Sequence, residues 1–308
     1  MLPTLANIDA LRVESIAALL PPDVRRWFDV RVIESTASTN SDLLRDCAAL
    51  PSGTVLAAEH QTAGRGRRGR AWVAPPEGSL AFSVLWKFRG NAAALAGLSL
   101  AVGVAAARAI TQCGAAGIAL KWPNDLLAWH DGGWAKLGGI LIELKTGPDA
   151  VSGTAGTADA ASMTSAPGTS SASRAADTVS AVIGIGINID LGAAAAGIGQ
   201  PVTDVRALGC GVSRNALLAA LLQQLGSVLP QFAQQGFAPL AAEWNQLHAW
   251  RGQVVQLMGE GGAAVAGATA GIAQGVAHDG ALLLDTPAGM VRAISGDVSL
   301  RLAPLNRP

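Results

Sequence analysis

The sequence contains few cysteines and no long uninterrupted apolar segment, and each absence excludes a class of protein. Its 308 residues include three cysteines, Cys47, Cys113 and Cys210, which match neither a disulfide framework nor a zinc-binding spacing. It has no run of about 18 apolar residues, which a membrane-spanning helix requires. The first thirty residues lack the apolar segment of a signal peptide. We therefore expect a soluble globular protein of a reducing cytoplasm.

The chain also has no net charge and few lysines. Its 22 basic residues balance 22 acidic residues, and only four of the basic residues are lysines. A sequence pI of about 6.9 gives no support to bulk nucleic-acid binding, which normally needs a basic surface. Because lysine is so scarce, each lysine in this chain needs a particular reason.

Length and apolar patterning predict one large domain followed by a smaller one. The chain exceeds the roughly 100–200 residues of a typical domain. Short apolar strands separated by Gly, Asp-Gly and Pro after Gly252 predict a small β-barrel. The elements expected before it are a helix beginning at Thr39, strands over Thr54–His60 and Ser79–Phe88, a helix over Ala94–Cys113, a hairpin with its turn at His130–Gly133, a strand over Ala181–Asp190 and helices over Ser213–Trp250.

These expectations divide the chain into a lead-in (1–32), a main domain (33–250) and a C-terminal domain (251–308). Within the main domain, the segment 147–180 is a low-complexity tract of mostly Ala, Ser, Thr and Gly. It has almost nothing large to bury, so it predicts a disordered insertion between two strands.

The stretch GRGRRGRAW, residues 64–72, places four arginines within seven residues. Its glycines match the dinucleotide-binding spacing, but Pro75 and Pro76 follow where that motif needs a helix. An RGG-like nucleic-acid segment would normally recur in a disordered tail, and a solvated basic loop is the usual fate of a charge run. Since four like charges repel one another, a polyanion bound by arginines and by glycine N–H groups explains the loop better.

The strand AKLGGILIEL places Lys136 in one row with Gly138, Ile140 and Ile142, which predicts that the lysine points toward the core. A lysine in that position needs an anionic partner, and Gly138 and Gly139 leave room for a ligand beside the backbone. The alternative is a side chain that reaches solvent at the strand end, and the pattern favours neither reading.

Two shorter motifs complete the set. In KWPND, Pro123 is expected to end a strand and leave Asn124 and Asp125 on a turn, from which they can reach a cleft, although an ordinary turn has the same pattern. GIGIN, residues 184–188, is a weaker signal because glycines in a buried strand often mean only tight packing. Combined with the arginine loop and Lys136, the motifs indicate a site for a nucleotide and a second anion.

These stretches resemble the biotin protein ligases, enzymes that adenylate biotin and pass it to a lysine of a carboxylase carrier domain. The similar segments are, in the family's order, STNSDLL, AEHQTAGRGRRGRAW, LSLAVGVA, KWPNDLL, KLGGILIEL and IGIGIN. They cover roughly residues 33–188 apart from the insertion. The resemblance implies an α+β fold: a mixed-sheet catalytic domain of the biotin/lipoate ligase type, related to class II aminoacyl-tRNA synthetases, with a small C-terminal SH3-like barrel.

The resemblance also implies the substrates, partners and site residues. ATP and biotin are the expected small-molecule substrates, with Mg²⁺, and a biotin carboxyl carrier protein domain is the expected partner; no membrane is expected, and a homodimer is allowed. The implied biotin-binding residues are Ser38, Thr39, Asn40, Gln61, Arg65, Gly66, Arg67 and Lys136. The implied ATP and adenylate residues are Arg67, Arg68, Arg70, Trp72, Asn124, Lys136 and Asn188. The implied catalytic residues are Lys136, Arg65, Arg67 and Asp125, of which Asp125 is also a weak candidate for the metal and for the proton acceptor in transfer.

Some family members also carry an N-terminal winged helix-turn-helix, but only about 35 residues precede STASTN here, too few for that domain. We therefore expect no DNA-binding repression. A lipoate or octanoate ligase or transferase is the alternative enzyme, although those enzymes lack the pairing of GRGRRG with KWPND. A non-catalytic biotin sensor is the alternative of another class.

Overall fold

The computed structural model describes residues 9–73, 75, 77–146, 178–258, 270–294 and 299–302. The predicted insertion falls outside the described residues, except that 178–180 form the start of a strand. The expected lead-in is more structured than its polar sequence suggests, because two short helices and the beginning of a strand lie before residue 33. These helices are α1 (Val13–Leu19) and α2 (Pro22–Arg25).

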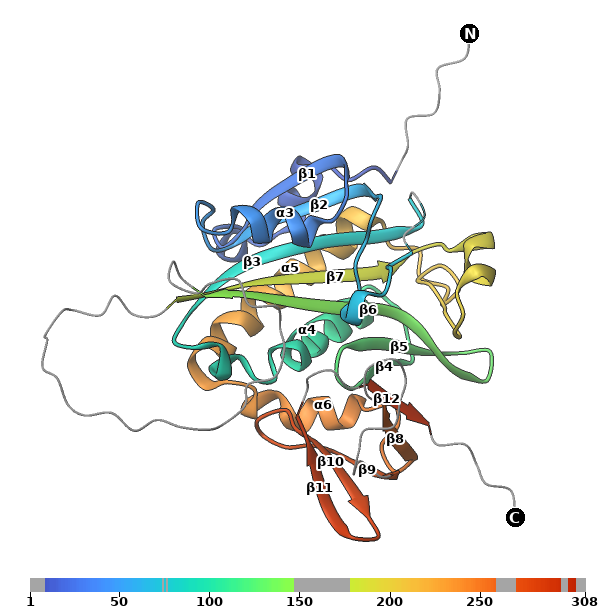
Figure 1. Ribbon diagram of the computed structural model, residues 1–308. Helices are drawn as coiled ribbons and strands as arrows, with labels where there is room; N and C mark the ends of the chain where they lie inside the picture. The colour runs from blue at the N-terminus through green and yellow to red at the C-terminus, as the bar shows by residue number, and fades with distance from the viewer. Residues whose placement is uncertain are drawn as a thin grey trace, which may run out of the picture.

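A seven-stranded mixed sheet forms the centre of the main domain (Figure 1). Its first two strands run parallel and the remaining pairs are antiparallel, which agrees with the expected α+β class. In sheet order the strands are β1 (Asp29–Thr36), β2 (Thr54–Gln61), β3 (Ser79–Arg89), β7 (Thr178–Asn188), β6 (Gly133–Thr146), β5 (Asp125–His130) and β4 (Ile118–Lys121).

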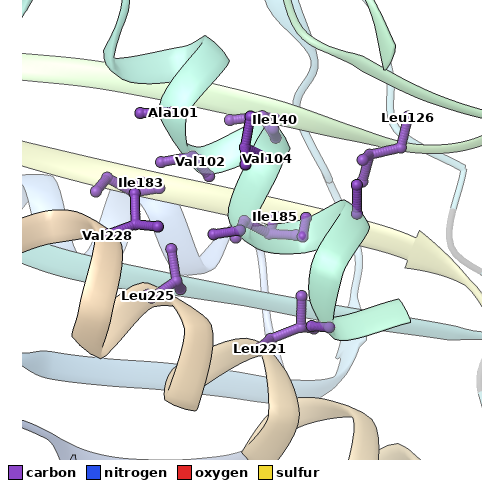
Figure 2. Packing of buried hydrophobic residues seen from close by; sticks show 14 of the residues in the cluster. Ala101, Val102, Val104, Leu126, Ile140, Ile183, Ile185, Leu221, Leu225 and Val228 are labelled. Atoms are coloured by element: carbon purple, nitrogen blue, oxygen red, sulfur yellow. The ribbon is translucent and has the colours of Figure 1, made fainter. Parts of the chain in front are cut away.

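Two long helices cover one face of this sheet and a short helix lies on the other (Figure 1). Helices α4 (Leu98–Gln112) and α5 (Arg214–Gln235) pack against each other and against the sheet. Figure 2 shows the apolar layer between them, in which Val104, Ile185 and Leu225 are buried. By length and composition, α5 and the helical stretch Ala92–Gln112, which includes α4, could each span a membrane, but the buried core helices of a folded domain have the same length and composition. Helix α3 (Thr39–Asp46) contacts β2, β3, β6 and β7.

Isoleucine and glycine alternate along β7, so this strand presents apolar side chains to one face of the sheet and bare backbone to the other. Ile183, Ile185 and Ile187 are buried in the core cluster with α4 and α5. Because successive residues of a strand point to opposite faces, Gly184 and Gly186 face the α3 side. The motif GIGIN therefore leaves a bare strip of backbone on the face where α3 lies.

A second sheet follows the main domain, as the sequence predicted. It is antiparallel, in the order β11-β10-β9-β8-β12, which agrees with a small SH3-like barrel. The indole of Trp122 in the main domain contacts this second domain, because Trp122 Nε1 donates a hydrogen bond of 3.2 Å to the carbonyl of Gly280. The strands of this sheet are β8 (Val254–Met258), β9 (Gly271–Val276), β10 (Leu282–Thr286), β11 (Gly289–Ala293) and β12 (Ser299–Leu302), and helix α6 (Ala241–Leu247) precedes them.

Short 3₁₀ turns also occur along the described part of the chain. They are η1 (Arg67–Gly69), η2 (Ala92–Leu95), η3 (Gly192–Gly197) and η4 (Ala238–Leu240).

Candidate active site

A pocket on the α3 face of the sheet brings all the sequence-predicted site residues together. It encloses a cavity of about 170 Å³ between α3, the arginine loop and strands β3, β6 and β7. The predicted residues that line it are Ser38, Thr39, Asn40, Gln61, Arg65, Gly66, Arg67, Arg68, Arg70, Trp72, Asn124, Asp125, Lys136 and Asn188. Segments up to 150 residues apart in the chain therefore meet in one place.

The beginning of α3 supplies hydroxyl and amide groups to the pocket. The helix begins at Thr39, as the sequence predicted, and its N-cap is Ser38, whose hydroxyl accepts from the N–H of Ser41. The Thr39 side chain is thereby released from capping and turns into the pocket wall. Its backbone N–H donates to Gln61 Oε1 at 2.8 Å, and its hydroxyl lies 3.1 Å from the same atom and 2.7 Å from Ser83 Oγ.

The Asn40 side chain is held by contacts with three strands, β3, β6 and β7. Its Oδ1 accepts from Ser83 Oγ at 2.6 Å, and its Nδ2 donates to the carbonyl of Leu141 and to Glu143 Oε2 at 3.0 Å. The side chain approaches the backbone of Gly184 so closely that a Cβ there would lie 2.3 Å from Oδ1. The glycine is thus required by close approach, so Asn40 shapes the pocket and its amide is already engaged by the protein.

We expect Gly184→Ala to disturb the packing of the Asn40 side chain against β7. The added methyl group would displace Asn40 from its hydrogen bonds, which should lower the free energy of unfolding by about 1–3 kcal/mol. Urea unfolding measures this effect. Gly133→Ala is the matched control on a strand, since its added Cβ meets nothing within 4 Å. Equal stability of the two variants would contradict this account of Gly184.

The arginine loop closes on itself as a small irregular hairpin. Trp72 N–H donates to the carbonyl of Gly64 at 2.8 Å, and Gly66 N–H donates to the carbonyl of Arg70 at 2.7 Å. At the tip, Arg68 has a left-handed backbone with φ of 61°, which costs a non-glycine residue free energy. In Figure 1 this segment follows β2 and crosses the sheet toward β6.

Two arginines of the loop contact the pocket rim. The Arg65 guanidinium forms an ion pair of 2.7 Å with Glu143 and donates to Ser41 Oγ at 3.0 Å. Arg67 Nη1 donates to Asn124 Oδ1 at 3.3 Å. The loop therefore carries its positive charge to the pocket, as the phosphate-binding interpretation required.

Trp72 lies over the bare backbone of β6 and β7. A Cβ on Gly186 would lie 2.6 Å from its ring, and one on Gly139 would lie 3.6 Å from it. The Lys136 ammonium is 5.8 Å from the centre of the indole, within the range of a cation–π contact. The glycines of KLGG and GIGIN thus provide a flat floor that accepts an aromatic ring.

Lys136 does not share a face with Gly138 and Ile140, so the reading in which it points toward the core is wrong. The pairing of β5 with β6 shifts register between Leu126 and Leu127, so that β6 carries an extra residue at this point. This irregularity puts Lys136 on the same face as Gly139 and away from Gly138, whose Cβ position meets Leu126 and Ile187 of the core. The side chain enters the pocket instead of the core, and it has the anionic partner that the sequence argument demanded.

That partner is Asp125, which lies between two lysines. Lys136 Nζ is 2.7 Å from Asp125 Oδ1, and Lys121 Nζ is 2.6 Å from Asp125 Oδ2. Burial by itself would raise the pKa of Asp125, but the charges of Lys136 and Lys121 outweigh burial and lower that pKa to about 2. Burial lowers the pKa of Lys121, against the opposing attraction of Asp125. The three groups together keep one net positive charge, and Asp125 is a weak base in this arrangement.

The low pKa of Asp125 predicts a pH dependence of stability. Its folded-state pKa lies below the ordinary value of 3.8, so its contribution is complete above pH 4 and is lost as the pH falls toward 2. That contribution is about 2 kcal/mol. We expect Asp125→Asn to be less stable than the wild type at pH 7 by at least this amount, and the difference to shrink below pH 4. Urea unfolding across this range measures it.

Asp29→Asn is the matched control, because Asp29 pairs with Arg31 on the exposed surface, where ion pairs contribute little. A stability difference between wild type and Asp125→Asn that stayed constant from pH 7 to pH 3 would contradict the assigned pKa.

The remaining motif residues hold backbone segments in place. Asn124 lies in the turn that KWPND predicted, between the antiparallel strands β4 and β5, but Asp125 is already the first residue of β5. Asn124 Nδ2 donates to the carbonyl of Ile140 at 2.8 Å. Asn188 Nδ2 donates to the carbonyls of Lys136 and Thr203 at 3.2 and 3.0 Å. Both amides tie the strands that carry Lys136 and Asp125.

The donor set does not fit a metal ion held by the protein. Both carboxylate oxygens of Asp125 are engaged by ammonium groups, which compete directly with a cation. Among the described residues, His, Cys, Asp and Glu side chains form no cluster of three that could hold a metal. Asp125, the weak metal candidate of the sequence, is therefore unsuited to hold a metal ion in this arrangement.

Sequence reasoning missed several polar residues in or beside the site, among them Lys121, Ser83 and Glu143, and also Arg301 of the C-terminal domain, which lines the pocket. Lys121 was one of four lysines in the chain, and its scarcity was the signal that could have identified it. Ser83 and Glu143 lie on the α3 faces of β3 and β6, where strand alternation alone would have placed them beside the pocket. The segment after η3 also contributes Ile198, Gln200 and Val202 to the lining.

Comparisons with known proteins identify the family of this chain. Residues 30–157 match the Biotin/lipoate A/B protein ligase family, and residues 266–301 match the Biotin protein ligase C terminal domain. The bifunctional ligase/repressor BirA of Escherichia coli is 34% identical over 89% of this chain and 74% of its own length. The biotin acetyl-CoA-carboxylase ligase of Paracoccus denitrificans is 33% identical over 84% of this chain and 95% of its own length.

Among solved structures, the Aquifex aeolicus biotin protein ligase in complex with biotin and ATP matches with a TM-score of 0.67 and 25% identity, over 89% of this chain and 99% of that chain. The family models, the curated relatives and the fold all agree. The chain described here therefore belongs to the biotin protein ligase family.

Proposed function

We propose that this chain activates biotin with ATP to biotinyl-5′-AMP, releases pyrophosphate, and transfers biotin to a lysine of a biotin carboxyl carrier domain. The observation that carries the proposal is the pocket itself. It brings together a basic loop, a polar cavity and the group of Lys136, Lys121 and Asp125, which has one net positive charge. The Paracoccus relative, which shares 33% identity, is named for the ligation of biotin to acetyl-CoA carboxylase.

The first half-reaction joins two anions. The biotin carboxylate attacks the α-phosphorus of ATP, and the two repel each other, so neutralisation and alignment are the main tasks of the site. Lys136 is directed into the pocket, and Arg65 and Arg67 reach its rim from the loop. We assign these three cations to the charge of the reacting carboxylate and phosphate, and no protein nucleophile is required.

Different walls of the pocket suit different parts of the substrates. Ser38, Thr39, Asn40, Gln61 and Gly66 line the end next to α3, which we assign to biotin. Hydroxyl and amide groups with fixed directions give the hydrogen bonds that an uncharged ring system needs for recognition. Residues assigned to ATP and the adenylate, in addition to Arg67 and Lys136, are Arg68, Arg70, Trp72, Asn124 and Asn188.

In the second half-reaction, the acceptor lysine must attack as a neutral amine. The pKa of about 2 argues against Asp125 as its proton acceptor and favours a role in orienting Lys136. The arginine loop would exclude water from the mixed anhydride until the carrier domain docks. We expect magnesium to enter with the phosphates of ATP, because magnesium retains phosphate and water ligands readily.

Other parts of the assignment stay predictions about this chain. They are a cytoplasmic location, a homodimer, the specific carrier protein, the absence of DNA-binding repression and the domain boundaries at 32 and 250. The lipoate alternative has a direct test, because lipoate or octanoate would replace biotin in the reaction.

Transfer to a carrier domain tests the proposal. The purified chain is incubated with biotin, magnesium-ATP and a biotin carboxyl carrier domain, and the intact mass of the carrier is measured. We expect the mass to increase by one biotin, and not in a carrier whose acceptor lysine is replaced by arginine. Modification with lipoate and not with biotin would support the alternative enzyme, and no modification by either would support a sensor.

A further inference from the structure

Glu143 connects the arginine loop to the wall of the pocket. It lies on β6, two residues beyond Leu141 on the face toward α3, and its side chain is 19% exposed. One carboxylate oxygen is 2.7 Å from Arg65 Nη2, and the other accepts from Asn40 Nδ2 at 3.0 Å. A single carboxylate therefore contacts both the loop and the buried amide behind the pocket.

A chain of hydrogen bonds continues from Asn40 across the pocket wall. Asn40 Oδ1 accepts from Ser83 Oγ, and because that hydroxyl has one proton, Ser83 must accept from Thr39 in return. Thr39 reaches Gln61 through its backbone N–H, which donates to Gln61 Oε1 at 2.8 Å, because its one hydroxyl proton is directed to Ser83. Arg65 is thus linked through Glu143 to the residues that we assigned to biotin.

The geometry of Arg65 depends on this link. Its side chain is half exposed, and a long side chain at the surface loses considerable freedom when one geometry is fixed. Glu143 and Ser41 engage two of its five N–H donors and fix the plane of the guanidinium. The remaining donors of a fixed plane meet a ligand at a lower entropic cost than those of a mobile one.

We propose that Glu143 is a positioning residue that fixes Arg65 over the pocket and thereby couples biotin binding to closure of the arginine loop. The inference rests on the proposed function, because it takes Thr39, Asn40 and Gln61 as the biotin wall. A purely structural role is the competing explanation, in which Glu143 only satisfies the buried amide of Asn40.

A double-mutant cycle separates the two roles. Glu143→Gln keeps the size of the side chain and an acceptor for Asn40 but loses the charge that holds Arg65. We expect the Kd for biotin, measured by calorimetry, to rise about tenfold in Glu143→Gln. In an Arg65→Met background the same change should have an effect within about twofold, because the coupled partner is already absent. Glu34→Gln on the exposed side of β1 is the matched control.

Limited trypsin digestion gives a second readout, since the loop carries four arginines. We expect Glu143→Gln to be cut faster than wild type between residues 65 and 70 without biotin, and to be less protected by biotin. A tenfold loss of affinity that persists in the Arg65→Met background, or cleavage equal to that of wild type, would overturn the proposal. A wild-type protein that does not bind biotin would instead refute the proposed function.

Discussion

Lys136→Ala should abolish biotin-dependent exchange of labelled pyrophosphate into ATP while the protein stays folded. Removing one preorganised donor to a developing charge commonly costs a factor of about 10²–10³ in rate, and Lys136 contributes a full charge in a partly buried site. We therefore expect the exchange rate to fall by at least about a thousandfold.

The structure explains why this variant should remain folded. Asp125 keeps its ion pair with Lys121 when Lys136 is removed, so no buried carboxylate is left without a partner. Lys145→Ala, on the exposed end of the same strand, is the matched control and should exchange normally. Thermal unfolding of both variants checks the fold. Near-normal exchange in folded Lys136→Ala would refute the role assigned to this lysine.

Arg67→Gly should release the activated intermediate before transfer. Arg67 lines the pocket and donates to Asn124, so its loss removes a charge-assisted contact from the loop. Such a contact is worth about 1.5–3 kcal/mol, which corresponds to roughly 10–100-fold faster escape of the adenylate. The glycine also makes the loop more flexible.

Escape is measured as biotin attached to exposed lysines of a bystander protein such as serum albumin. We expect strong labelling with Arg67→Gly, weak labelling with wild type, and an intermediate level with Arg67→Lys, which keeps the charge but not the planar group. Bystander labelling that is equal in all three, with exchange activity intact, would contradict the view of the loop as a barrier.

The motifs predicted which residues gather in the site, and the reason lies in strand alternation and turn chemistry. GIGIN was read as a weak signal, yet its isoleucines face the helices and its glycines face Asn40 and Trp72. Short-range pattern was enough to place the strands, because each apolar row must meet the core. Family resemblance then indicated which polar side chains meet on the other face.

Side-chain orientation was predicted less well, because it depends on partners far away in the sequence. The reversed direction of Lys136 follows from an irregularity in the pairing with β5, which no local pattern of β6 reveals. The role of Glu143 depends on its ion pair with Arg65, which lies 78 residues earlier in the chain. Lys121 likewise belongs to the site through its ion pair with Asp125, a contact that depends on how β4 pairs with β5.

The most direct test of the account is biotin-dependent exchange of labelled pyrophosphate into ATP by the purified wild-type chain. The reaction requires only the pocket, biotin and magnesium-ATP, and it needs no carrier protein. The account predicts exchange with biotin and none with lipoate or octanoate. Exchange that occurs with lipoate but not with biotin, or no exchange with any of the three acids, would contradict it.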